Sequence, residues 1–268
     1  MNASRLIFAA LAASLLAPVA MADERLQAVV DDPARPADEK ARDPYRHPVE
    51  TLTFFGIEPD MTVVEIAPGG GWYTEILAPY LAEEGRLVAA HYDVDAENAA
   101  EYWPRVVEAW RERVADEQRY GEIEFVPFAP PQTVDFGEPG SADMVLTFRN
   151  VHGWKRDGSF DEVLEAAHEV LRDGGVLGVV GHRLPADRAE PEDFTGYVHQ
   201  DWVVARAESH GFRLVEASEI NANPADTADH PNGVWTLPPS LNVDDESAVE
   251  KYREIGESDR FTLKFVKR

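Results

Sequence analysis

The chain has 268 residues, no cysteine, and 50 Asp and Glu against 25 Lys and Arg, which gives a formal net charge of -25 at pH 7. Without cysteine it forms neither disulfides nor thiol-based sites. The negative charge argues against nucleic acid or an anionic membrane as a partner, because phosphate groups are bound by basic surfaces. It would attract a cationic small molecule, although high solubility alone also accounts for it.

The first 22 residues have the three-part layout of a secretory signal. Arg5 precedes an apolar stretch at 6–16, and Ala20-Met21-Ala22 places small residues before the acidic Asp23. The apolar stretch is shorter than a membrane span of about 20 residues, so cleavage after Ala22 is favoured over an N-terminal anchor. We therefore expect a periplasmic or secreted protein with no stable membrane anchor once the signal is removed.

The rest of the chain is organised as a short polar segment followed by one domain. Residues 23–50 are rich in proline, and we expect an arm or lid there, before a domain at 51–268. A short helix should run from Pro48 to Gly56, and β-branched runs then alternate with helical periodicity. The predicted strands cover 62–67, 86–91, 122–126, 143–148, 176–180, 212–220 and 260–268. Four helices are predicted among these strands: one directly after the first strand, one at 96–115, one that begins after Ser159 and one at 201–210.

The helix after the fourth strand has the clearest boundaries. Ser159 and Glu162 have capping-box spacing, and Gly174 lies where the helix would end. Alternating strands and helices predict an α/β, doubly wound, mostly parallel seven-stranded sheet. The last two strands have no helix between them and predict an antiparallel C-terminal pair, with a polar insertion at 221–259 before the last strand.

The stretch VVEIAPGGGWYTEIL, residues 63–77, places three glycines between the first strand and its helix. At the carboxyl end of a parallel strand, such a turn lets a ligand approach the backbone closely. A phosphate-binding P-loop is excluded because Trp72, Tyr73 and Thr74 follow the glycines in place of Lys and Ser or Thr. A dinucleotide site is a weak alternative, since Thr74 replaces the third small residue of that motif.

The segment VVEIAPGGGWYT resembles motif I of the class I S-adenosylmethionine-dependent methyltransferases, with Ala67-Pro68-Gly69-Gly70-Gly71 in the glycine pattern. Later segments resemble that family's second, fourth and fifth strands: GRLVAAHYD, SADMVLTF and EVLRDGGVLGVV. Over about residues 44–268 the chain is similar to a group of predicted exported bacterial methyltransferases. The resemblance implies a Rossmann-like methyltransferase fold, S-adenosyl-L-methionine as cofactor, and a small-molecule or peptide-like acceptor.

The resemblance also implies which residues contact the cofactor. Glu65 would lie near its amino-acid end, the backbone of residues 67–71 would approach it, and Trp72 would form an aromatic wall. An aromatic face near a cation contributes about 0.5 to 2 kcal/mol. Family members usually end the second strand with an acid that binds the ribose. Here His91 stands at that position, with Asp93 two residues later, and either could make the contact.

The loop after the fourth strand, TFRNVHGW, carries the candidate catalytic residues. His152 is the candidate base, because an imidazole can titrate near neutral pH. Asn150 could orient the acceptor, and Arg149 could hold a carboxylate. Further candidate substrate contacts are Trp154, His182, Arg183, Tyr45 and His199. No metal is expected, because the histidines lack the close spacing of ligand motifs.

The sequence is also compatible with two other functions. An exported binding protein of the same fold could keep the pocket without methyl transfer, because the cofactor is made in the cytoplasm. A fold-sharing enzyme with different chemistry is the other alternative.

Overall fold

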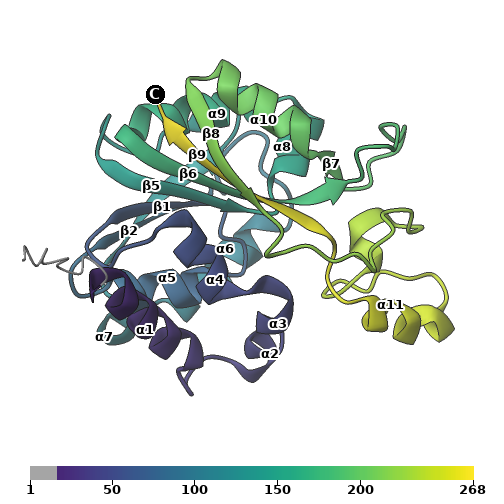
Figure 1. The fold of residues 1–268 in the computed structure, drawn as a ribbon, viewed down its shortest axis with the longest axis horizontal. Coiled ribbons are helices and arrows are strands. Elements are labelled where there is room, and N and C mark those ends of the chain that lie inside the picture. Colours follow the sequence, from purple (N-terminus) through teal and green to yellow (C-terminus); the bar gives the residue numbers. More distant parts are fainter. Residues whose placement is uncertain (1–16) are drawn as a thin grey trace, which may run out of the picture.

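The computed structural model describes the backbone of residues 17–268, with side chains from Glu24 onward. In this part of the chain seven longer strands form one sheet, in the order β3-β2-β1-β5-β6-β9-β8 (Figure 1). The parallel strands are β1 (Thr62–Ile66), β2 (Arg86–Tyr92), β3 (Ile123–Ala129), β5 (Ala142–Phe148) and β6 (Leu171–Leu184). β9 (Arg260–Lys267) runs antiparallel to both of its neighbours, β6 and β8 (Phe212–Ser218). The predicted fold class is confirmed.

Two short strands extend this sheet at its margins. β4 (Thr133–Val134) pairs antiparallel with the end of β3, and β7 (Val198–His199) pairs with the end of β6. Neither changes the order of the seven longer strands.

Helices cover both faces of the sheet, so the fold is doubly wound (Figure 1). One face carries α1 (Ala17–Asp31), α4 (Pro48–Phe55), α5 (Thr74–Leu81), α6 (Trp103–Arg113) and α7 (Glu117–Tyr120). The other carries α8 (Val151–Asp157), α9 (Phe160–Val170) and α10 (Gln200–Ser209). Side chains alternate between the faces along a strand, so Val63 of β1 packs in one apolar cluster and Val64 in the other.

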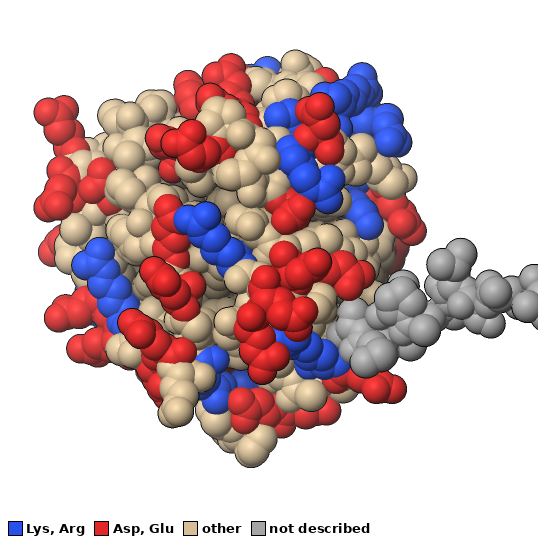
Figure 2. Space-filling model, turned by 90° about the vertical axis from the view of Figure 1, so that its left-hand side faces the viewer, with Lys and Arg blue, Asp and Glu red and all other residues tan. Residues whose placement is uncertain are grey.

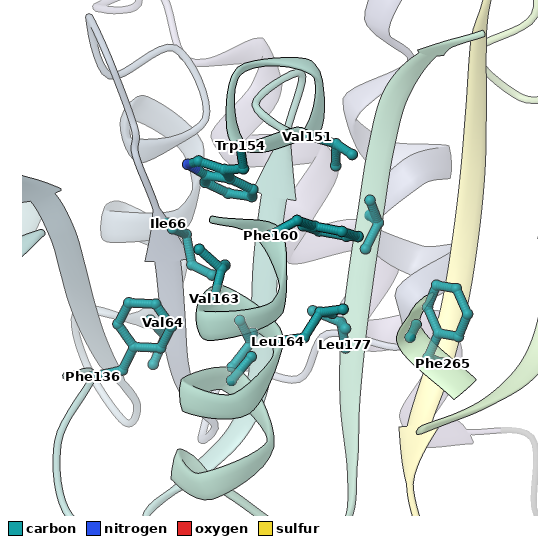
Figure 3. Close-up of a cluster of buried hydrophobic side chains, with 14 of the residues drawn as sticks. Val64, Ile66, Phe136, Val151, Trp154, Phe160, Val163, Leu164, Leu177 and Phe265 are labelled. Atoms are coloured by element: carbon teal, nitrogen blue, oxygen red, sulfur yellow. The ribbon is translucent and has the colours of Figure 1, made fainter. Parts of the chain in front are cut away.

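The apolar stripe of α9 holds that helix against the sheet. Its buried residues recur at helical spacing and are Phe160, Val163, Leu164, Ala167 and Val170. Figure 3 shows α9 side chains with β1 and β6 residues in one cluster: Phe160, Val163, Leu164, Val64, Ile66 and Leu177. Burying a large aliphatic side chain contributes about 1.5 to 3 kcal/mol. This contact therefore fixes the position of α9, and with it the end of the segment that leads from β5 to α9.

Some predicted boundaries differ from the structure. Ser159 is the N-cap of α9 but makes no capping hydrogen bond, and its buried Oγ has no partner. α9 ends at Val170, and Gly174, with φ of 73°, lies inside β6, which starts at Leu171. α6 begins only at Trp103, because Pro104 lacks an N–H and is accommodated in the first turn of a helix.

The segment at 23–50 forms helices that pack on the domain. α1 contributes Leu26 and Val30 to the apolar cluster that contains α5, and it is followed by α2 (Ala37–Lys40) and α3 (Asp43–Arg46). α1 runs through the predicted cleavage position at Ala22, whereas residues 1–16 of the predicted signal lie outside the described residues. Among helices in the described range, none is long and apolar enough to cross a membrane.

The insertion at 221–259 lies at one end of the sheet, on the right of Figure 1. It contains two short 3-10 helices (Gly233–Thr236 and Glu246–Ala248) and α11 (Val249–Ile255). A small apolar cluster of Leu184, Tyr197, Ala228 and Val234 joins it to the end of β6. Its end meets the N-terminal segment, since Arg42 Nε donates to Glu257 Oε1 at 2.8 Å.

Acidic residues are spread over the face of the molecule shown in Figure 2. On the face shown in Figure 2, acidic side chains are distributed with basic ones between them. Many form exposed ion pairs, such as Arg25 with Glu84, and exposed pairs contribute only about 0 to 1 kcal/mol each. On this face the charge does not mark a single binding patch.

Candidate functional site

A cavity of about 340 Å³ lies at the carboxyl ends of β1, β5 and β6. β2 and β5 flank β1 on opposite sides, which makes this the point where the strand order reverses. In open α/β sheets ligands bind at such a point, and this volume lies in the range of about 300–1,000 Å³ for small-molecule sites. A larger cavity of about 530 Å³ lies near Thr62 and Arg86, at the amino ends of β1 and β2, away from this position.

The glycine turn after β1 is open to this cavity. Its lining includes Ala67, Pro68, Gly69 and Gly70, and a Cβ added at Gly69 or Gly70 would meet nothing within 4 Å. At Gly71, with φ of 84°, a Cβ would lie 2.9 Å from Cδ1 of Trp110. The first two glycines therefore expose backbone to the cavity, and the third allows α6 to pack closely.

Asn150 holds the turn in place. Its Nδ2 donates to the carbonyls of Ile66 at 3.0 Å and Ala67 at 3.3 Å, and to Thr147 Oγ1 at 3.1 Å. Ala67 has φ of 51°, a conformation that is unusual for a residue other than glycine. Asn150 lines the cavity, and these bonds link the end of β5 to the end of β1.

Trp72 forms one wall of the cavity and is 6% exposed. Its Nε1 donates to the carbonyl of Glu39 at 3.1 Å, and the guanidinium of Arg46 lies 4.6 Å from its ring centroid. The N-terminal segment thus covers this wall and fixes its orientation.

Glu65 lies below the turn and does not line the cavity. It is 2% exposed and accepts a hydrogen bond from Thr74 Oγ1 at 2.6 Å, and Thr74 Oγ1 in turn accepts from Trp110 Nε1 at 3.1 Å. Burial raises the pKa of Glu65 to about 7. Glu65 is thus bonded to α5, and through Thr74 to α6, and it lies outside the cavity lining, away from the ligand contact that the sequence predicts.

His91 is fully buried under the turn. The N–H of Tyr92 donates to His91 Nδ1 at 2.8 Å, so the ring proton is on Nε2, which donates to the carbonyl of Gly69 at 3.0 Å. Burial lowers the pKa of His91 to about 4, which keeps the ring neutral. Asp93 also lies outside the cavity lining and accepts from Thr133 Oγ1 at 3.3 Å. The residue of β2 that lines the cavity is Tyr92.

Two histidines meet on the wall of the cavity. The rings of His152 and His182 lie 5.3 Å apart, and His182 Nδ1 shares a hydrogen bond of 2.5 Å with Ser258 Oγ. Burial lowers the pKa of His152 to about 4, with Arg149 as the next cause. Burial also lowers the pKa of His182, with His152 as the next cause. Both rings are therefore neutral at pH 7, and His152 Nδ1 is buried without a hydrogen-bond partner.

Arg149 lines the cavity, has φ of 66°, and its side chain makes no hydrogen bond with any described residue. Burial lowers its pKa to about 10, and the nearby carboxylate of Glu257 opposes this shift. Glu257 accepts hydrogen bonds from Arg42 at 2.8 Å, Arg46 at 3.0 Å and Arg260 at 3.1 Å. These interactions lower the pKa of Glu257 to about 2 despite its burial.

The remaining predicted contacts lie outside the cavity lining. Trp154 is a core residue, 6% exposed, packed near Phe160. The ring of Tyr45 lies against Gly256 and is 40% exposed. Arg183 pairs with Asp259 at 2.8 Å, an interaction that raises its pKa. His199 is the N-cap of α10.

Several lining residues were not predicted from the sequence. They come from the segments expected to be an arm and an insertion, and they include Glu39, Arg42, Trp235, Ser240, Glu257 and Ser258. Their sequence signal was weak, because Arg, Glu and Ser are frequent in exposed segments. Tyr92 had a stronger sequence signal, since it directly follows His91 at the end of β2.

No known family profile matches the sequence, and no curated protein matches it. Solved structures do match in fold. A SAM-dependent methyltransferase from Aquifex aeolicus has a TM-score of 0.57 and 16% identity, over 92% of this chain and 98% of that one. The glycopeptide N-methyltransferase MtfA has a TM-score of 0.53 and 14% identity, over 84% and 91%. At such low identity these likenesses show a shared fold, the Rossmann-like methyltransferase fold.

Proposed function

We propose that this protein is an S-adenosylmethionine-dependent methyltransferase that acts on a small-molecule or peptide-like acceptor. The observation that carries the proposal is the open backbone of Gly69 and Gly70 at the strand-order reversal, on a cavity that Arg149, Asn150 and His152 also line. The fold shared with solved methyltransferases supports the choice of cofactor.

The residues near the turn suit S-adenosylmethionine on its amino-acid side. Trp72 and Tyr92 offer aromatic surface to the cavity, and aromatic faces stabilise cations. Glu39 also lines it, and its Oε2 is buried without a hydrogen-bond partner, which suits an ammonium group. The ribose side differs from the family pattern, because His91 is used to bind the carbonyl of Gly69.

When bound, S-adenosylmethionine supplies a methyl group activated by a sulfonium. The protein then has mainly to align the acceptor, so that its lone pair forms a bond to the methyl carbon as the carbon–sulfur bond breaks and leaves its electron pair on sulfur. His152 is neutral and its Nδ1 has no partner among the described residues, so it can accept the hydrogen of an O–H or N–H acceptor; its pKa of about 4 makes it a weaker base than the near-neutral imidazole expected from the sequence. Arg149 can hold a negative group of the acceptor.

A ligand-binding protein with the same cavity and no methyl transfer is the second candidate. The position of His91 favours it, because the residue that replaces the family's ribose-binding acid is fully buried. We also propose that the protein acts outside the cytoplasm, on the basis of the signal-like pattern at 1–22, and that its acceptor is not a nucleic acid, on the basis of its charge.

The test uses the full chain, methyl-tritiated S-adenosylmethionine and an extract of small molecules and peptides. We expect the wild-type protein to transfer label, and His152→Gln to slow transfer by a factor of about 100 or more. His199→Gln is the matched control, because His199 does not line the cavity and should keep the activity. If the cofactor raises the melting temperature but nothing is labelled, the binding protein is favoured. If neither occurs, both candidates fail for this cofactor.

A further inference from the structure

The cavity is bordered by an arginine cluster, here defined as Arg42, Arg46, Arg149 and Arg260 with the single carboxylate of Glu257. Arg46 and Arg260 are 1% and 3% exposed, and Arg42 and Arg149 line the cavity. Four guanidinium groups thus share one carboxylate, which leaves a surplus of positive charge in a largely buried place.

Several guanidinium nitrogens of this cluster have no acceptor. The buried atoms without a hydrogen-bond partner are Arg42 Nη2, both Nη atoms of Arg46, and Nε of Arg260. Arg149 adds a guanidinium on the cavity that makes no hydrogen bond with any residue in the described part of the chain. A buried donor without an acceptor costs about 1 to 3 kcal/mol, and more when it is charged. Such a cluster offers several hydrogen-bond donors to an incoming anion.

The histidines beside the cluster cannot balance it. His152 and His182 are neutral and add no negative charge, and Arg149 is among the groups that lower their pKa values. The cofactor of the proposed function cannot balance it either, because S-adenosylmethionine carries a sulfonium and an ammonium against one carboxylate. Glu39, the other carboxylate named on the cavity, pairs with Arg113 and lies outside this cluster, so we look to a second ligand for the negative charge.

From this surplus and from the position of Arg149, we infer that the acceptor carries an oxyanion, a carboxylate or a phosphate, which binds Arg149 and Arg42 in the cavity. The planar guanidinium matches both groups with paired hydrogen bonds. That the bound anion belongs to the methyl acceptor rests on the proposed function, whereas the anion site itself is inferred from the cluster alone. It also explains how a protein with a net charge of -25 can take up an anion: the positive charge is concentrated at the cavity.

The test measures the melting temperature of the full chain with sodium succinate, sodium phosphate, or sodium chloride at matched ionic strength. We expect succinate or phosphate to raise the melting temperature of the wild-type protein by about 2 °C or more over chloride, and the more effective ion identifies the group. Arg149→Gln should lose this gain, and its ligand-free form should melt no lower than wild type, because the cost of burying this cation outweighs its attraction to Glu257. Arg42→Gln is the second variant and should also lose the gain. Arg213→Gln is the control and should keep the gain, because Arg213 is an exposed residue of β8.

Calorimetric titration with S-adenosylhomocysteine on the same proteins separates the two proposals. Binding that Arg149→Gln leaves within about threefold of wild type, together with the loss of the anion effect, supports the acceptor site. If Arg149→Gln abolishes binding of S-adenosylhomocysteine, the arginine holds the cofactor and the inference is wrong. If neither anion stabilises the wild type beyond chloride, or if Arg149→Gln keeps the gain, the inference is also wrong while the methyltransferase proposal stands. An anion effect without cofactor binding contradicts only the proposed function.

Discussion

The imidazole of His91 donates its Nε2 proton to the carbonyl of Gly69 at 3.0 Å, which ties the end of β2 to the glycine turn after β1. The second ring nitrogen accepts the N–H of Tyr92 at 2.8 Å, so both nitrogens of this fully buried ring are used. His91 thus supports the shape of the turn, and Tyr92 takes the place on the cavity wall at the end of β2.

Restoring an acid at this position should weaken the fold. In His91→Asp a carboxylate oxygen can take the place of Nδ1 and accept the N–H of Tyr92, but the carbonyl of Gly69 loses its donor and a buried carboxylate lies beneath the turn. We expect the free energy of unfolding to fall by about 1 to 3 kcal/mol in urea titrations at pH 7. Asp93→Asn is the neighbouring control, with a change below about 0.5 kcal/mol. An unchanged midpoint for His91→Asp would contradict the supporting role of this ring.

The buried carboxyl of Glu65 should make stability depend on pH in an unusual direction. Its pKa in the folded protein is raised from 4.5 to about 7, mainly by burial. The folded state therefore binds the proton more tightly than the unfolded state, so this group lowers the free energy of unfolding progressively as pH rises from about 4.5 to 7. Below that window the cost is absent, and above it the cost is complete, at most about 3 kcal/mol.

Glu65→Gln cannot ionise and should gain stability relative to wild type as the pH is raised from 5 to 8. Urea titrations at both pH values measure this difference, with the exposed Glu122→Gln as the control that shows no such change. A difference between Glu65→Gln and wild type that is the same at pH 5 and pH 8 would show that Glu65 is ionised in the folded protein throughout.

The second and third glycines of the turn should respond differently to alanine. Gly71 has φ of 84°, and a Cβ there would lie 2.9 Å from Trp110, so Gly71→Ala should lower the free energy of unfolding by about 1 kcal/mol or more. Gly70 has open space around its Cβ position, so Gly70→Ala should change it by less than about 0.5 kcal/mol. Thermal or urea unfolding of the two variants measures both. Equal losses would mean that the turn is packed against side chains at both positions.

The parts of this molecule that could be predicted from sequence are those specified by local pattern. The apolar run at 143–148 predicted that strand, and helical spacing predicted the stripe of α9. The segment after the strand, expected to be a loop, forms α8 from Val151 onward and brings Arg149, Asn150 and His152 to the cavity. In a parallel sheet, the residues that directly follow a buried strand lie at its carboxyl end, where ligands bind.

The other parts of the site depend on packing between distant segments, which no local pattern encodes. Arg42 and Glu257 are 215 positions apart and meet beside the cavity. His91 lies at the position expected for ribose binding, but its Nε2 donates to the carbonyl of Gly69 instead. Trp154 lies two residues after His152 in α8, about half a helical turn away, and is therefore directed into the core.

The most direct test of the account is calorimetric titration of S-adenosylhomocysteine into the wild-type protein and into Gly70→Val. The valine side chain would project into the space beside Gly70, where a Cβ meets nothing within 4 Å. We expect saturable binding of one ligand per wild-type chain, and binding weakened about tenfold or more in Gly70→Val, with an unchanged melting temperature for the ligand-free variant. Absence of binding heat with wild type, or equal affinity in the two proteins, would contradict the assignment of the glycine turn to the cofactor.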